Sequence, residues 1–256
     1  MTRAPHRRAC RAGGHRVEYA SMMLDVQELT RRFGRDTALD GVTFSADAGE
    51  RIAVVGRNGA GKTTLLRVLS TFLPADSGRA SVAGFDLFSR GGAVRSVVGY
   101  LPEGAPLDPD LRVAEYLRFR GHLRRMSGRH LRRRLHDVAA FCGLAPILNA
   151  RIRALSAGQR HAVGLADAIL HEPDVLLFDD PLAAADAVQA RSFARLLAAP
   201  EVSDGRLVLF STHDAGLVRA AATRVLFLER GRLAADTTNI PLAGSLADWF
   251  DRWSAQ

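Results

Sequence analysis

Hydrophobic residues in this chain form short apolar runs that are separated by longer stretches of helical periodicity. The runs that read as buried strands cover residues 51–55, 97–101, 175–178, 207–210 and 225–228. Helical patterns cover 63–72 and 111–148, and Pro173 ends another helix just before the third run. Strands buried on both faces have this uniformly apolar composition. Because strands alternate with helices, the pattern predicts an α/β fold with a mainly parallel sheet between two helical layers.

Further segments show patterns that predict additional strands, a hairpin and a C-terminal amphipathic helix. Alternating residues 24–29 predict a strand, residues 41–48 a second β segment, and residues 225–233 a hairpin. After Pro241, apolar residues at helical spacing predict an amphipathic helix within 241–256 that packs on its own domain. Its apolar positions are Leu242, Leu246, Trp249, Phe250 and Trp253.

The first 22 residues are rich in Arg, Ala, Gly and His and show no hydrophobic periodicity, which predicts a disordered, Arg-rich tail. We expect Met22 or Met23 to be the native start. No window approaches 18 consecutive apolar residues, so no transmembrane helix is predicted. The only cysteines, Cys10 and Cys142, exclude a disulfide scaffold.

The net charge is +8, and one arginine cluster stands out within the chain. It comprises Arg118, Arg120, Arg124, Arg125, Arg129, Arg132, Arg133 and Arg134. We interpret this cluster as a solvated helix face rather than a nucleic-acid surface, so no nucleic-acid partner is expected. Among 35 basic residues, only Lys62 is a lysine. A position that departs from so strong a preference for arginine indicates a need for a compact ammonium charge.

Lys62 lies in a glycine-rich segment that follows the strand 51–55 and opens the helix 63–72. The segment reads Gly56, Arg57, Asn58, Gly59, Ala60, Gly61, Lys62, Thr63, and it matches the P-loop spacing in full. Its backbone N–H groups and the helix N-terminus would wrap a phosphate chain. Lys62 would reach the terminal phosphates, Thr63 would bind Mg²⁺, and Thr64 would donate to a phosphate.

The apolar strand 175–178 ends in a pair of carboxylates. Asp179 could hold Mg²⁺ beside the P-loop, and Asp180 could orient the attacking water. These motifs together indicate an NTPase. A small GTPase would also need a lysine in its guanine-reading motif, and the single lysine is already in use.

Two further motifs narrow the class of NTPase. Residues 155–160, Leu-Ser-Ala-Gly-Gln-Arg, precede an apolar helix and place Ser156 23 residues before Asp179. Residues 211–213, Ser-Thr-His, end the next strand, so that His213 lies 34 residues after Asp179. This order of motifs resembles the ATP-binding subunit of an ABC transporter over about residues 23–235.

The resemblance implies the P-loop fold of ABC ATPases, with an antiparallel β subdomain and a helical signature subdomain over about 104–170. It implies a domain over 23–240 that binds ATP and Mg²⁺. Phe33 would stack on adenine, and Glu103 would stand at the loop that links the metal site to the membrane partner. Ser156, Ala157, Gly158 and Gln159 would contact the ATP of a second subunit, Asp186 would occupy the D-loop, and His213 would contact the terminal phosphate.

The chain departs from the family pattern at several positions. Ala157 replaces a glycine, Glu103 a glutamine, and residues 183–186 lack the usual serine. Asp180 replaces the catalytic glutamate, which withdraws the carboxylate by about 1 Å, and a misplacement of that size can cost roughly 100-fold in rate. The departures leave nucleotide binding in place and bring the rate of hydrolysis into question.

By the family's mechanism, two subunits in a homodimer or heterodimer sandwich ATP head to tail and drive a separate transmembrane permease. The segments 98–107 and 113–117 resemble ABC-2 type exporters, including the gliding-motility group. The haem-exporter subunit of cytochrome c maturation is the alternative within the family. A regulatory or degenerate half-site subunit that binds ATP but hydrolyses it weakly is the alternative to an active ATPase. The resemblance implies a cytoplasmic protein held at the inner face of the plasma membrane by its permease.

Overall fold

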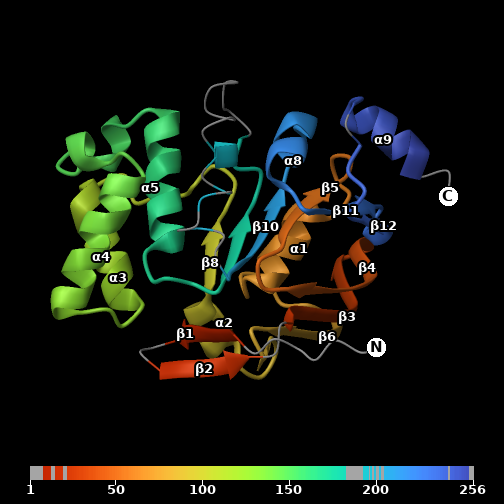
Figure 1. Cartoon of the computed structure of the whole chain (residues 1–256), viewed down its shortest axis with the longest axis horizontal. Helices are drawn as coiled ribbons and strands as arrows, with labels where there is room; N and C mark the ends of the chain where they lie inside the picture. Colours follow the sequence, from red (N-terminus) through yellow and green to blue (C-terminus); the bar gives the residue numbers. More distant parts are fainter. Residues whose placement is uncertain are drawn as a thin grey trace.

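The computed structural model describes residues 8–12, 15–19, 22–182, 193–195, 197, 199, 202, 205–241 and 243–253. Figure 1 shows a group of helices on one side and a sheet with its covering helices on the other. The two parts are joined through helix α5, and the second sheet lies along one edge of the sheet-containing part.

The main sheet has six strands in the order β12-β11-β5-β10-β9-β8. Its strands are β5 (Arg51–Val55), β8 (Val98–Leu101), β9 (Val175–Phe178), β10 (Leu207–Ser211), β11 (Arg224–Glu229) and β12 (Arg232–Thr237). All neighbours pair in parallel except β11 and β12, which form an antiparallel hairpin. The predicted mainly parallel sheet and the predicted hairpin are therefore confirmed.

Each central strand contributes side chains to two separate cores. In β5, Ile52 and Val54 face one hydrophobic cluster, whereas Ala53 and Val55 face the other. The first cluster contains helix α1 (Lys62–Leu69), and the second contains α5 (Ala157–Ile169) and α8 (Ala215–Ala221). Burial on both faces explains why these strands are continuous apolar runs rather than alternating ones.

A second, antiparallel sheet of order β4-β3-β6-β7 packs on the α1 side. Its strands are β3 (Met22–Phe33), β4 (Asp36–Asp47), β6 (Ser77–Val82) and β7 (Phe85–Asp86). Residues 24–27 alternate between buried and more exposed positions, as predicted, and the alternation shifts at Glu28, whose φ is 51°. Helix α2 (Gly91–Val97) then leads into β8.

The helical subdomain has a third core of its own. It contains α3 (Val113–Leu123), α4 (Gly128–Phe141), the short 3-10 helices η1 (Ala145–Ile147) and η2 (Ile152–Ala154), and one face of α5. The single helical stretch predicted over 111–148 is thus interrupted. Arg125 and Gly128 both have positive φ, 59° and 57°, which a continuous right-handed helix does not allow.

Residues near the N-terminus differ from the disordered tail that the composition predicts for 1–22. Strands β1 (Arg8–Ala12) and β2 (His15–Tyr19) pair as an antiparallel hairpin. Two glycines, residues 13 and 14, separate the strands in the sequence, and such a pair is a common hairpin signal. The prediction considered composition and overlooked this local signal.

The C-terminal segment forms helix α9 (Leu246–Trp253). Trp249 is fully buried in the same core as α8, and its indole N–H donates to the carbonyl of Ala243 at 3.0 Å. Leu246 is also buried there. The helix packs on its own domain, as the spacing of its apolar residues predicts.

Candidate nucleotide-binding site

The turn between β5 and α1 requires glycine at two positions. Gly61 is the N-cap of α1 with a φ of 103°, and a Cβ there would lie 2.3 Å from the carbonyl oxygen of Ala38. A Cβ at Gly56 would lie 2.3 Å from the carbonyl oxygen of Leu228. Because only glycine tolerates such close approaches, the spacing of the motif follows from the packing of the loop against its neighbours.

The N-terminus of α1 is open. No side chain caps it, and its first turn contains no acidic residue. The first N–H groups of a helix have no partner within the helix, and they concentrate positive potential at this end. The loop therefore offers backbone donors to an anion, as a phosphate chain requires.

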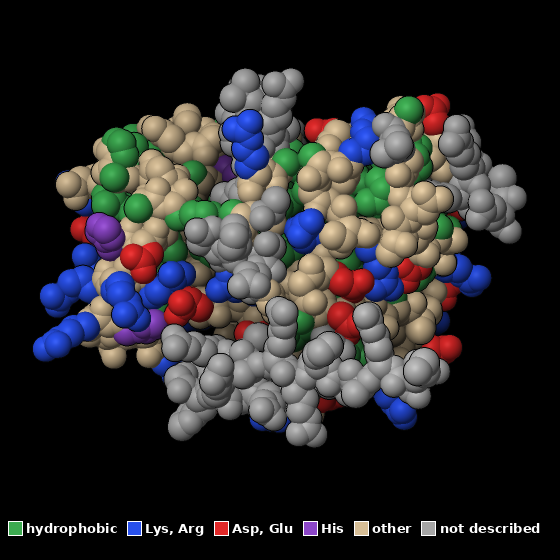
Figure 2. Space-filling model, in the orientation of Figure 1, with side chains coloured by type: hydrophobic (Ala, Val, Ile, Leu, Met, Phe, Trp, Pro, Cys, Tyr) green, Lys and Arg blue, Asp and Glu red, His purple; other side chains and the backbone are tan. Residues whose placement is uncertain are grey.

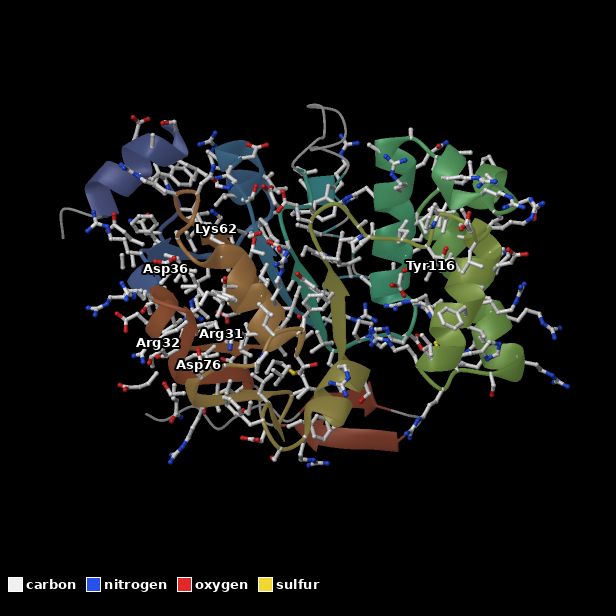
Figure 3. The ribbon with its side chains drawn as sticks, turned by 180° about the vertical axis from the view of Figure 1, so that it is seen from behind. Arg31, Arg32, Asp36, Lys62, Asp76 and Tyr116 are labelled. Carbon is white, nitrogen blue, oxygen red and sulfur yellow. The ribbon has the colours of Figure 1, made fainter. Side chains whose placement is uncertain are left out.

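Lys62 stands at the start of α1 and lies back over the loop (Figure 3). Its Nζ donates to the carbonyl oxygens of Gly56 at 2.8 Å and Arg57 at 3.1 Å. Burial lowers the pKa of Lys62, and the carboxylates of Asp180 and Asp179 oppose that shift. Since both hydrogen-bond acceptors are neutral carbonyls, the ammonium charge remains suited to an anionic ligand.

Asp179 lies at the end of β9 with 1% of its surface exposed. Its Oδ1 accepts hydrogen bonds from the hydroxyls of Thr63 and Ser211, both at 2.9 Å, and the Tyr100 hydroxyl lies 3.5 Å from Oδ2. These donors are neutral. A P-loop hydroxyl beside a strand-end carboxylate is the oxygen pair that P-loop NTPases use for Mg²⁺, so the residues present fit this ion.

Five titratable groups influence one another beside the loop. Burial raises the pKa of Asp180, His213 and Lys62 lower it, and Glu103 and Asp179 raise it. The backbone N–H of Asp180 donates to the Ser211 hydroxyl at 2.8 Å, and its φ is 40°. A carboxylate whose pKa is raised is a better proton acceptor than an ordinary aspartate.

His213 follows β10 and is exposed. Partial desolvation of the ring lowers its pKa and the charge of Lys62 adds to this, while Asp180 and Glu103 oppose it. The imidazole is therefore neutral near pH 7 and can donate one hydrogen bond. Glu103 is exposed just after β8 and acts on both Asp180 and His213 through its charge.

The signature residues occupy the N-terminus of a different helix. Ser156 is the N-cap of α5 and forms a capping box with Gln159. The Ser156 hydroxyl accepts from the backbone N–H of Gln159 at 3.2 Å, and the backbone N–H of Ser156 donates to Gln159 Oε1 at 2.9 Å. Residues 156–159 are all exposed, with Ala157 as the first helical residue and Gly158 as the second. No hydrogen bond between described residues joins them to the P-loop.

Phe33 ends β3 and keeps 45% of its surface exposed. The guanidinium of Arg31 lies 4.8 Å from its ring centroid. Asp76 holds this strand end by accepting from Arg31 Nη1 at 3.1 Å and from the Arg32 N–H at 2.6 Å, and Asp36 opens the next strand (Figure 3). An exposed aromatic ring on a fixed strand end is available for stacking on a base.

Two residues of this site, Ser211 and Tyr100, lie in motifs that the sequence shows, but their roles were not predicted. Ser211 bonds both the Asp179 carboxylate and the Asp180 N–H, and Tyr100 reaches the same carboxylate. Burial, together with the charge of Asp179, raises the pKa of Tyr100 to about 12, so its hydroxyl stays protonated. The predicted D-loop residue Asp186 lies outside the described residues.

The match to known proteins decides the family. Residues 39–183 match the family described as ABC transporter. The chain belongs to the ABC transporter family. The match includes the P-loop, the signature and Asp179, and it agrees with the α/β fold, the antiparallel sheet and the separate helical subdomain. The chain is an ATP-binding subunit of this family, as the motif order predicts.

Curated relatives are similar over most of this chain. It is 31% identical over 210 residues to "Nod factor export ATP-binding protein I" of Ralstonia nicotianae, covering 82% of this chain and 65% of that protein. It is 33% identical over 219 residues to "Daunorubicin resistance ATP-binding protein DrrA3" of Streptomyces coeruleorubidus, covering 86% and 69%. The chain thus spans about two thirds of the length of these two relatives.

Solved structures show the same fold. A structure described as the ATP-binding subunit of an ABC transporter superposes with a TM-score of 0.81 at 25% identity, covering 91% of this chain and 99% of that one. A dimeric ATP-binding cassette in a post-hydrolysis state, bound to ADP and Pi, superposes with a TM-score of 0.77 at 23% identity, covering 87% and 100%. In the described part of this chain, no helix has the length and hydropathy needed to cross a bilayer.

Proposed function

We propose that two copies of this chain, or this chain and a related subunit, pair head to tail around ATP and drive a separate transmembrane permease. The observation that carries this proposal is the separation of two half-sites. Lys62 and the open N-terminus of α1 form one half, and the exposed residues 156–159 form the other, with no hydrogen bond between them. ATP that contacts both halves favours the closed pair, because it binds that state more tightly.

Within the closed pair, different residues of the chain bind the nucleotide and assist its hydrolysis. The loop amides and Lys62 hold the phosphates, and Phe33 stacks on the adenine. Asp180 accepts the proton of the attacking water, and the neutral His213 donates to the terminal phosphate. Mg²⁺, held by Thr63 and Asp179 with Glu103 nearby, would supply positive charge to the phosphate oxygens.

Export is the direction that the relatives support, since their names refer to Nod factor export and to daunorubicin resistance. An ABC-2 type export role fits better than a haem-exporter role on this ground. We place the subunit at the cytoplasmic face of the membrane, held there by its permease.

A second candidate function rests on the short carboxylate at position 180. Asp180 has one methylene fewer than glutamate, and its backbone is fixed by Ser211 at a positive φ. On this alternative the chain binds ATP and closes, but a partner subunit performs most of the hydrolysis. Asp180→Glu separates the two: a large gain in turnover favours the alternative, and an unchanged rate favours the active ATPase.

Mixing two inactive variants tests the head-to-tail arrangement. Lys62→Ala disables one half-site and Ser156→Arg disables the other, so each variant alone has two broken ATP sites. A mixed pair contains one intact site, and random pairing predicts recovery of roughly a tenth to a quarter of the original ATP turnover. If the mixture shows only the sum of the separate residual rates, the arrangement is wrong. A mixture of Lys62→Ala with Lys62→Met is the matched control, and it should show no recovery.

A further inference from the structure

The arginine cluster of the helical subdomain divides into two sets in the structure. One set faces inward: Arg120 pairs with Asp167 at 2.9 Å, and Arg134 donates to the carbonyls of Leu170 and Ile169 at 3.2 and 3.1 Å. Arg118 and Arg132 form no ion pair with any described residue. Cationic and histidine side chains gather on this side of the molecule, over α3 and α4 (Figure 2).

Arg118 and Arg132 border a cavity of about 500 Å³ between α3, α4 and the turn after η1. Pockets for small ligands measure about 300–1,000 Å³, so this volume is within their range. The ten lining residues are Ala114, Leu117, Arg118, His122, Gly128, Leu131, Arg132, Leu135, His136 and Leu148.

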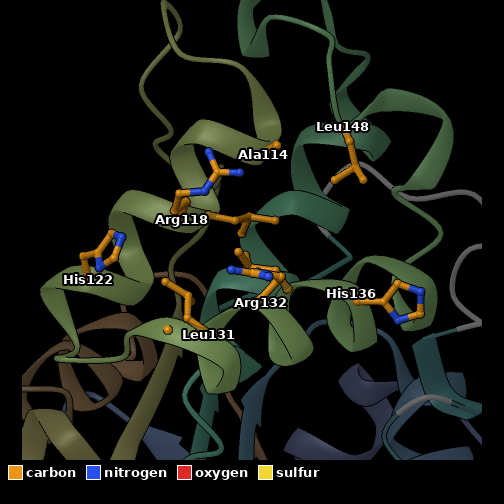
Figure 4. Close-up of a pocket in the computed structure, with 10 residues that line it drawn as sticks. Ala114, Arg118, His122, Leu131, Arg132, His136 and Leu148 are labelled. Atoms are coloured by element: carbon orange, nitrogen blue, oxygen red, sulfur yellow. The ribbon is translucent and has the colours of Figure 1, made fainter.

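The cavity has an apolar floor and a cationic rim. Leu117 and Leu131 are buried at its base, and Leu135 and Leu148 are half-buried beside them. Arg118 and Arg132 lie between His122 at one end and His136 at the other (Figure 4). None of the described residues that line the cavity is acidic, and His136 Nδ1 lies 3.8 Å from the carboxylate of Asp137.

A helix N-terminus adds to the positive potential of this cavity. Gly128, the first residue of α4, lines it. The Ser127 side chain makes no capping hydrogen bond, and the first turn of α4 contains no acidic residue. Free N–H groups at this end and the two arginines favour an anion at the same mouth.

We propose that this cavity binds a small anionic amphiphile, with its phosphate or carboxylate on Arg118 and Arg132 and its apolar chain on the leucine floor. Charge complementarity requires the anionic head, and the four leucines require an apolar body. The volume of about 500 Å³ fits a single short chain. None of the lining residues belongs to the nucleotide site, so this inference does not depend on the proposed transport function.

Calorimetric titration of the full chain with octyl phosphate below its critical micelle concentration tests the proposal. We expect binding in the micromolar range, on the order of 10–100 μM. Inorganic phosphate and 1-octanol, which carry the head and the chain separately, should each bind at least about 10-fold more weakly. No binding of octyl phosphate, or equal binding of either fragment, would overturn the proposal.

A double variant and a matched control locate the site. Arg118→Gln with Arg132→Gln should weaken octyl phosphate binding by about 10-fold or more. Arg129→Gln with Arg133→Gln removes the same charge from two exposed positions of α4 that do not line the cavity, and should change binding less than about 3-fold. Equal losses of octyl phosphate binding in the two double variants would mean non-specific electrostatic attraction and would overturn the proposal.

Ala114→Leu tests the cavity without changing any charge, since the larger side chain fills it. Octyl phosphate binding should be lost while the thermal midpoint of the free protein is retained. Co-sedimentation with phosphatidylglycerol vesicles distinguishes the source of the ligand: vesicle binding that Ala114→Leu leaves unchanged, together with no binding of octyl phosphate, would assign the cationic face to a membrane surface and reject the pocket.

Discussion

The P-loop region and the helical subdomain both bury charged groups, but they partner them differently. Lys62 bonds neutral carbonyls and Asp179 bonds neutral hydroxyls, so both keep their charge for a ligand. In the helical subdomain, Arg120 and Asp167 neutralise each other at 2.9 Å. At the P-loop the charged groups with neutral partners, Lys62 and Asp179, thus lie at the proposed binding site, whereas Arg120 and Asp167 form a structural contact.

Replacing Asp180 in the P-loop region should have the largest effect. Asp180→Asn removes the proton acceptor while it keeps the size of the side chain, so ATP turnover should fall by about 10²–10⁴-fold. Phosphate release measures the rate, and light scattering with ATP measures dimerisation, which should persist. A variant that keeps more than half of the original turnover would show that another group accepts the proton.

Breaking the internal pair of the helical subdomain should affect stability rather than turnover. Asp167→Asn removes the negative charge that pairs with the partly buried Arg120. The Asp167 side chain is only 11% exposed, so water does not replace this partner. Removing one partner of a fully buried pair costs about 3–5 kcal/mol. Because Arg120 is 34% exposed and screened, we expect about 1–3 kcal/mol here.

Chemical denaturation measures the unfolding free energy of Asp167→Asn, and Lys62→Met is the comparison variant. The unfolding free energy of Lys62→Met should stay within about 1 kcal/mol of the original, because Lys62 has only neutral hydrogen-bond partners. If Lys62→Met destabilises the chain as much as Asp167→Asn does, the distinction between the two regions fails.

Replacing Ser211 should have an intermediate effect on ATP turnover. Ser211→Ala removes the hydroxyl that holds both the Asp179 carboxylate and the Asp180 N–H, so we expect a fall in kcat of about 10-fold. The Kd for ATP should change less than about 3-fold, since the loop amides and Lys62 remain. Ser211→Thr keeps the hydroxyl and should restore most of the rate; equal losses in both variants would mean that packing, not the hydroxyl, is responsible.

The pH dependence of turnover should show the smallest effect. The folded chain raises the pKa of Asp180, so this carboxyl gains its proton at a higher pH than an ordinary aspartate does. Since the base must be deprotonated, turnover should decline on the acid side at a pH above the usual aspartate range of about 4. An acid limb at or below that range, measured by phosphate release across buffers, would contradict the assignment of Asp180 as the base.

Local sequence was sufficient to predict the P-loop between a strand and a helix, the strand that ends at Asp179 and the helix after residues 155–160, because each is encoded within a few neighbouring residues. The role of Ser211 was not predictable in this way. It depends on the register of separate strands. Phe178, the last residue of β9, pairs with Phe210 of β10, and this brings the residues that follow them, Asp179 and Ser211, side by side. A sequence shows the strands but not their register.

The break between α3 and α4 and the N-terminal hairpin were also missed. Leucines continue at helical spacing across the break, and only the backbone reveals the left-handed conformation of Arg125. The cavity between α3 and α4 likewise depends on how two helices pack. From the sequence alone, the arginine cluster was therefore interpreted as a solvated helix face. Structure was needed to separate Arg120, which pairs internally, from Arg118 and Arg132.

The measurement that tests the account most directly is steady-state phosphate release by the full chain with Mg-ATP, beside Lys62→Ala. We predict turnover that Lys62→Ala lowers by at least about 100-fold, with an unchanged thermal midpoint of the free protein. Turnover that persists in Lys62→Ala would contradict the claim that the free charge of Lys62 marks the nucleotide site.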